Sequence, residues 1–89
     1  MTKPKLERII AGSLVESLPY NREQYLKSVE FLKPEHFKNE VYRSIFEAFI
    51  FGGLNDLSVK IGTLKKLRKN FACLDKLRDH ALNLMECGE

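Results

Sequence analysis

Tryptophan is absent from this 89-residue chain, and cysteine, proline and glycine are scarce. Its two cysteines, Cys73 and Cys87, lack the further cysteines or well-spaced histidines that a zinc site needs, so both are interpreted as reduced thiols. Charged or polar residues interrupt every apolar stretch well before the roughly 20 residues that a membrane-spanning helix requires. Since the N-terminus does not resemble a signal peptide, the default prediction is a cytoplasmic protein without membrane contact.

Patterns that support catalysis are missing as well. The phosphate-binding run G-x-x-x-x-G-K-[ST] does not occur, and Gly52-Gly53 is better explained as the end of a helix. His36 and His80 lie far apart in sequence, so we expect a capping or core-edge role for His36 and a solvated position for His80. For Cys73 we expect a small, half-buried thiol. The sequence therefore predicts no enzyme, no metal ion and no cofactor.

What the chain does contain is helical periodicity. Apolar residues recur at i, i+3 and i+4, whereas the alternation of a half-buried strand is absent. The predicted fold is all-α, a compact bundle of about five short helices, in one domain over residues 1–89 with its core at about 5–86. The expected core positions, helix by helix, are Leu6, Ile9, Ile10, Leu14 and Leu18; Tyr25, Leu26, Val29 and Leu32; Val41, Tyr42, Ile45, Phe46, Phe49 and Ile50; Ile61, Leu64 and Leu67; and Leu74, Leu77, Ala81 and Met85.

Helix boundaries follow from local signals between these stripes. Pro19 ends the first helix, and Asn21 is placed to cap the second. Residues 33–37 predict a tight helical turn, with Phe37 available to fill the core. The chain then restarts at Asn39 with the helix whose apolar pattern is strongest, and this third helix is predicted to be the central one.

The main charge cluster lies on the predicted fourth helix, in a chain of net charge +3 and pI near 9.0. It comprises five cations with no acid among them, which are Lys60, Lys65, Lys66, Arg68 and Lys69. A solvated helix face is the simpler interpretation, and weak, salt-sensitive contact with DNA, RNA or an acidic partner is the functional one. Asn55 and Asp56, in the connection before this helix, are the other candidate contact positions.

Three motifs occur in an order that resembles a known family. Residues 7–14 resemble an opening helix with the pattern E-x-x-V-L-G-x-L-L, residues 32–37 a turn with the pattern L-x-P-E-D-F-Y, and residues 41–48 a helix with the pattern H-R-x-I-F-x-A. A fourth segment, residues 59–64, is similar to I-D-x-x-T-L, although Lys60 replaces the acidic residue that begins the helix. Together these motifs resemble the N-terminal domain of DnaB-type replicative helicases.

The resemblance implies a role in DNA replication. Family members continue into a helical hairpin that forms the ring collar and contacts primase, and then into an ATP-driven motor; as a complete protein, this chain would lack both. The expected function is a non-enzymatic protein-interaction domain that docks on or mimics part of the helicase and primase machinery, as a loader, recruiter or inhibitor encoded by a phage or mobile element. Expected partners are the replicative helicase, primase or a helicase loader, and the expected state is a monomer or weak homodimer. The alternative is a small nucleic-acid-binding protein that uses the basic fourth helix.

Overall fold

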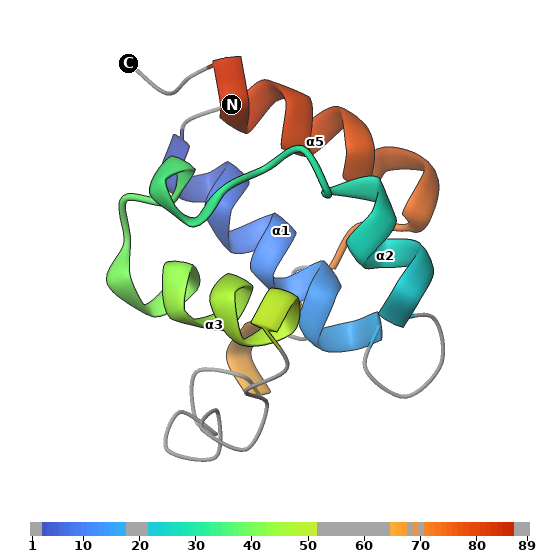
Figure 1. Cartoon of the computed structure of the whole chain (residues 1–89). Coiled ribbons are helices and arrows are strands. Elements are labelled where there is room, and N and C mark those ends of the chain that lie inside the picture. Colours follow the sequence, from blue (N-terminus) through green and yellow to red (C-terminus); the bar gives the residue numbers. More distant parts are fainter. Residues whose placement is uncertain (1–2, 18–21, 52–64, 68, 70, 87–89) are drawn as a thin grey trace.

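The computed structural model describes residues 3–17, 22–51, 65–67, 69 and 71–86. Within these ranges the regular structure is entirely helical, and no strand occurs. The elements are α1 (Lys3–Ser17), α2 (Arg22–Ser28), the 3₁₀-helix η1 (Pro34–His36), α3 (Glu40–Phe51) and α5 (Leu74–Glu86), and residues 65–67 are also helical (Figure 1). The predicted all-α fold is confirmed.

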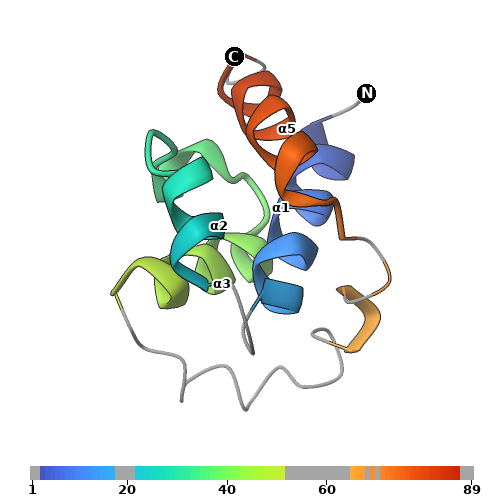
Figure 2. The same ribbon diagram turned by 90° about the vertical axis from the view of Figure 1, so that its right-hand side faces the viewer.

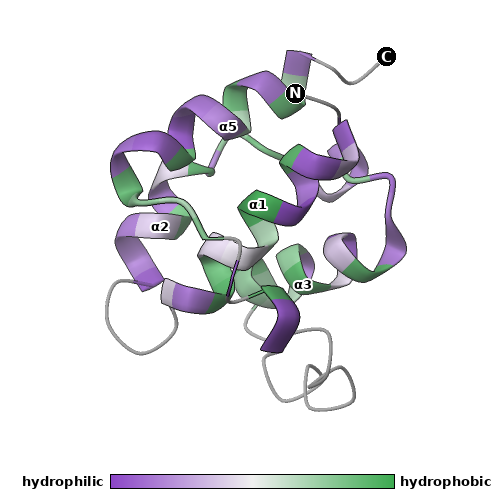
Figure 3. Ribbon diagram, turned by 180° about the vertical axis from the view of Figure 1, so that it is seen from behind, coloured by the Kyte–Doolittle hydropathy of each residue, from purple (hydrophilic) through white to green (hydrophobic). Residues whose placement is uncertain are grey.

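Helix α1 is the centre of the bundle. It contacts α2, α3 and α5. Every residue from Ile10 to Val15 is buried, and because successive residues of a helix are about 100° apart, six such residues cover its whole circumference. Figure 3 shows this hydrophobic middle of α1 between α2 and α5, whose ribbons are largely hydrophilic. The prediction that the third helix is central is therefore wrong. Residues 11–13 are small and buried, but they contribute little to the apolar periodicity of α1. The periodicity therefore underestimates how deeply α1 is buried.

The second helix is shorter than its apolar pattern indicates. Helix α2 ends at Ser28, and Val29 and Leu32 lie in the following turns, where both are nevertheless buried. The backbone N–H of Leu32 donates to the carbonyl of Val29 at 2.9 Å, an i→i−3 bond that tightens the chain into a turn. The predicted turn at 33–37 is confirmed as η1 followed by buried Phe37.

Helix α3 begins at a side-chain cap. The Oδ1 atom of Asn39 accepts the backbone N–H groups of Val41 at 2.9 Å and Tyr42 at 3.2 Å, which confirms the predicted restart. Ile45, Phe46 and Phe49 are buried, as predicted from their spacing. Ile50 was predicted for the core but is 41% exposed, because the residues of α3 that pack inward lie on a narrower face than the sequence stripe.

Helix α5 runs alongside α1, with its C-terminal end on the side of the molecule where α1 begins (Figures 1 and 2). Its buried residues are Leu77, Ala81 and Leu84. The predicted core position Met85 is instead partly exposed, and Leu84 takes its place, because i+7 from Leu77 falls on the inward face. Within the described part of the chain, no helix is long and apolar enough to cross a membrane.

Candidate interaction surfaces

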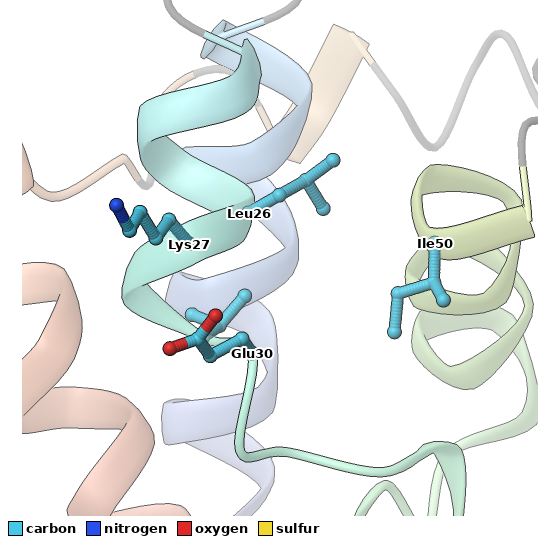
Figure 4. A pocket seen from close by; sticks show the side chains of 5 residues that line it. Leu26, Lys27, Glu30 and Ile50 are labelled. Atoms are coloured by element: carbon cyan, nitrogen blue, oxygen red, sulfur yellow. The ribbon is translucent and has the colours of Figure 1, made fainter.

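A hollow lies between α2 and α3, both of which pack against α1. Its volume is about 290 Å³, and Leu26, Lys27, Val29, Glu30 and Ile50 line it. Figure 4 shows the side chains of Leu26 and Ile50 pointing toward each other across the gap. The volume of the hollow is at the lower end of the about 300–1,000 Å³ of small-molecule sites, and it has room for one large side chain of a partner.

A polar contact fixes the distance between the two helices that form this hollow. The Nη2 atom of Arg22, the first residue of α2, donates to the backbone carbonyl of Phe49 at 2.7 Å. That carbonyl belongs to the last turn of α3, where helical carbonyls lack intrahelical donors and where positive charge is favourable. Arg22 therefore holds the start of α2 against the end of α3.

The last two residues of α3 expose large apolar side chains, and the first of them, Ile50, lines the hollow. Ile50 is 41% exposed and Phe51 is 76% exposed. Single exposed apolar residues are common on protein surfaces, but here Ile50 lines an apolar hollow with Leu26 and Val29, and Phe51 is its neighbour in the sequence. Leu26, Val29, Ile50 and Phe51 are called the α2–α3 surface below. Lys27 and Glu30 also line the hollow, and Figure 4 shows their charged ends on the side of α2 that faces away from Ile50.

The basic cluster predicted from the sequence is only partly described. Lys65, Lys66 and Lys69 are exposed, whereas Leu67 between them is buried. The core stripe and the basic face are thus compatible at these positions, as the sequence predicts. The remaining candidate contact residues lie outside the described residues, and these are Asn55, Asp56, Lys60 and Arg68. Lys65, Lys66 and Lys69 are called the basic segment below.

An exposed aromatic residue, Phe71, follows the basic segment. The helical periodicity of the sequence did not predict that it lies on the surface. Phe71 is 53% exposed, and the next residue, Ala72, donates its backbone N–H to Oγ of Ser13 at 2.7 Å. Ser13 is fully buried in α1 and donates its own hydroxyl to the carbonyl of Ile9 at 2.8 Å. The chain after the basic segment is therefore attached to the central helix by a buried hydroxyl.

The two histidines have different surroundings. Nδ1 of His36 accepts the backbone N–H of Lys33 at 2.9 Å, which confirms the predicted capping role. His80 is only partly exposed, and its buried Nδ1 has no hydrogen-bond partner, so the predicted solvated position is wrong. His80 lies three residues after buried Leu77 and four before buried Leu84, so it shares the inward side of α5. Within the described ranges, no group of three His, Cys, Asp or Glu residues is placed to hold a metal ion.

Cys73 was predicted to be half-buried but is exposed. It immediately precedes α5, and its backbone carbonyl accepts the N–H groups of Lys76 and Leu77, each at 3.0 Å. A residue that precedes a helix in this way does not follow the helical periodicity, so its side chain is not carried onto the buried face with Leu77. The other cysteine, Cys87, lies outside the described residues.

A buried carboxylate in α1 joins the first and third helices. Glu7 is only 1% exposed, and its Oε1 atom accepts the backbone N–H of Asn39 at 3.0 Å. Asn39 is also the cap of α3, so Glu7 holds the residue at which that helix begins. Hydropathy could not reveal this role, because a glutamate beside an apolar stripe is ordinarily solvated. The only sequence signal is that Glu7 opens the first of the family-like motifs.

Searches of models of known protein families, of curated proteins and of solved structures find no match to this chain. The resemblance to the DnaB-type N-terminal domain therefore depends on the ordered motifs alone. The structure assigns physical roles to positions within them: Glu7 and Phe37 are buried at contacts between elements, and Ile45 and Phe46 are buried in α3. These are packing roles, which describe a fold rather than an activity.

Proposed function

We propose that this chain is a non-enzymatic docking domain of DNA replication, which binds the replicative helicase, primase or a helicase loader through the α2–α3 surface. The observation that carries the proposal is the exposure of Phe51, at 76%, directly after Ile50, which lines a hollow of about 290 Å³. Protein interfaces are dominated by a few aromatic and aliphatic anchors that fill pockets. Phe51 provides such an anchor, and the hollow provides a pocket for an anchor of the partner.

The assignment to replication comes from the ordered motifs alone, and the choice of surface comes from the exposed end of α3. The sequence places candidate contacts at Asn55 and Asp56, in the connection after the third helix, and Phe51 is the last residue of α3 before that connection. The proposed domain resembles the N-terminal domain of the helicase but acts as a loader, recruiter or inhibitor. Such a domain needs a surface that contacts the helicase or primase and takes no part in catalysis. An apolar surface with charged residues of both signs nearby is suited to that task.

The test is direct binding of the purified protein to the replicative helicase, primase and loader of its source or host. Phe51→Ala should weaken the dissociation constant by at least about tenfold, because truncating an interface anchor costs about 2 kcal/mol or more. The matched control is Met85→Ala, which removes another partly exposed apolar side chain from α5, away from the hollow. Binding to none of the three proteins, or equal weakening by both variants, would contradict the proposal.

Measuring the mass of the protein in solution distinguishes self-association through the same surface from binding to a replication protein. If Phe51 mediates contact between two copies, light scattering should show a dimer that Phe51→Ala converts to a monomer. A monomer that still binds a replication protein through Phe51 supports docking on a partner, whereas a stable dimer without partner binding counts against it.

A further inference from the structure

The basic segment has a charge environment that differs from the rest of the chain. Between Asp56 and Asp75 the sequence contains no acidic residue, although acids and bases alternate elsewhere. Three of the cations in this stretch, Lys65, Lys66 and Lys69, are exposed. The stretch is therefore the most strongly basic part of a chain whose net charge is only +3.

Two attachments flank Lys69 and Phe71. Leu67 is 1% exposed and anchors the helical part of the basic segment in the core. On the other side, the N–H of Ala72 donates to Ser13 of α1. Lys69 and Phe71 lie between these two attachments and both face solvent. A ligand that binds Lys69 and Phe71 meets side chains flanked by two anchored residues, which reduces the entropy lost on binding.

We propose that the basic segment together with Phe71 binds single-stranded nucleic acid. Lysine ammonium groups bind phosphates as point charges, and an exposed aromatic ring stacks on the face of an unpaired base. The bases of a duplex are stacked on one another and offer Phe71 no free face, so the aromatic favours a single strand. Base stacking is tolerant of sequence, and lysines read no base edge here, so binding is independent of sequence.

The expected strength follows from the number of charges. Each phosphate contact on a single strand contributes about −0.7 to the slope of log affinity against log salt, so the three described lysines give a slope near −2. Affinity should therefore fall roughly fifteenfold between about 50 and 200 mM salt. This dependence distinguishes phosphate contacts from the apolar docking proposed for the α2–α3 surface, which does not involve these residues.

The experiment is fluorescence anisotropy of labelled oligothymidylate and oligouridylate of about 12 nucleotides with the full chain. The double variant Lys65→Glu, Lys69→Glu should abolish binding. The matched control is Lys5→Glu, Lys38→Glu, which changes net charge equally at two exposed lysines and should retain measurable binding. Lys5 lies in the first turn of α1, at the opposite end of the molecule from residues 65–67 in Figures 1 and 2.

The contribution of Phe71 is tested separately. Phe71→Ala should weaken binding at least about fivefold, and Phe71→Tyr, which keeps the ring, should retain it. Thermal unfolding followed by circular dichroism establishes that each variant is folded. The proposal is overturned if a duplex of the same length binds as tightly as the single strand, if both charge-reversal variants lose binding equally, or if Phe71→Ala has no effect. Equally tight binding of polyglutamate would assign the segment to acidic proteins and would also overturn it.

Discussion

The contact between Glu7 and Asn39 makes a quantitative prediction about how α1 and α3 are joined. In Glu7→Ala the backbone N–H of Asn39 loses its acceptor at 3.0 Å, and a buried side chain is truncated. Hydrogen bonds to charged groups contribute about 1.5–3 kcal/mol, so we expect the free energy of unfolding to fall by about 2 kcal/mol. For a domain of this size, that corresponds to a fall in melting temperature of roughly 8–16 °C.

The assay is urea unfolding followed by circular dichroism, with Glu16→Ala as the control. Glu16 is an exposed glutamate on the same helix, so both variants gain the same helix propensity from alanine, and only one loses a buried hydrogen bond. Glu7→Gln keeps a carbonyl oxygen able to accept the Asn39 N–H and should cost less than half as much as Glu7→Ala. If Glu7→Ala and Glu16→Ala unfold at the same urea concentration, Glu7 does not join the helices as described.

Two further substitutions, each with a control, test the core and the hollow. Phe46 is fully buried with its ring centroid 4.8 Å from that of Phe37, so Phe46→Ala should cost about 3–5 kcal/mol in urea unfolding. Phe51→Ala on the exposed end of the same helix should change stability by less than about 0.5 kcal/mol, and equal losses would refute this assignment of the inward face. Arg22→Met keeps the apolar stem but removes the donor to Phe49, and should cost about 1 kcal/mol or more, whereas Arg78→Met on the exposed face of α5 should be neutral.

The sequence predicted the helical class and most of the core because both depend on periodicity. Ile10, Leu14 and Leu77 repeat at helical spacing and are all buried. Periodicity fails where burial does not require hydropathy. The small residues Ala11, Gly12 and Ser13 are buried in α1, yet they contribute little to an apolar stripe, so the sequence underestimated the helix at the centre. It fails again at the end of α3, where Ile50 repeats in register but lies beyond the packed face.

The candidate surfaces were predictable only in part, for a related reason. The exposed lysines of the basic segment follow from composition and from the buried position of Leu67. The hollow could not be predicted, because it depends on the distance between α2 and α3, which belong to separate parts of the sequence. Exposure of Phe51 and Phe71 was likewise invisible, since an apolar side chain carries the same sequence signal whether it packs in the core or faces solvent.

Three polar contacts determine where the two surfaces lie, and each joins a side chain to a distant backbone group. Arg22 and Phe49 are 27 residues apart, Glu7 and Asn39 are 32, and Ser13 and Ala72 are 59. An apolar core tolerates many arrangements of similar volume, whereas a hydrogen bond has a direction and a fixed length. Arg22 thereby sets the width of the hollow, Glu7 sets the residue at which α3 begins, and Ser13 holds the chain beside Phe71. Arg22 and Glu7 both hold α3, which carries part of the α2–α3 surface, whereas Ser13 holds the chain beside the basic segment. Loss of the Ser13 contact should therefore loosen the basic segment and leave the α2–α3 surface in place.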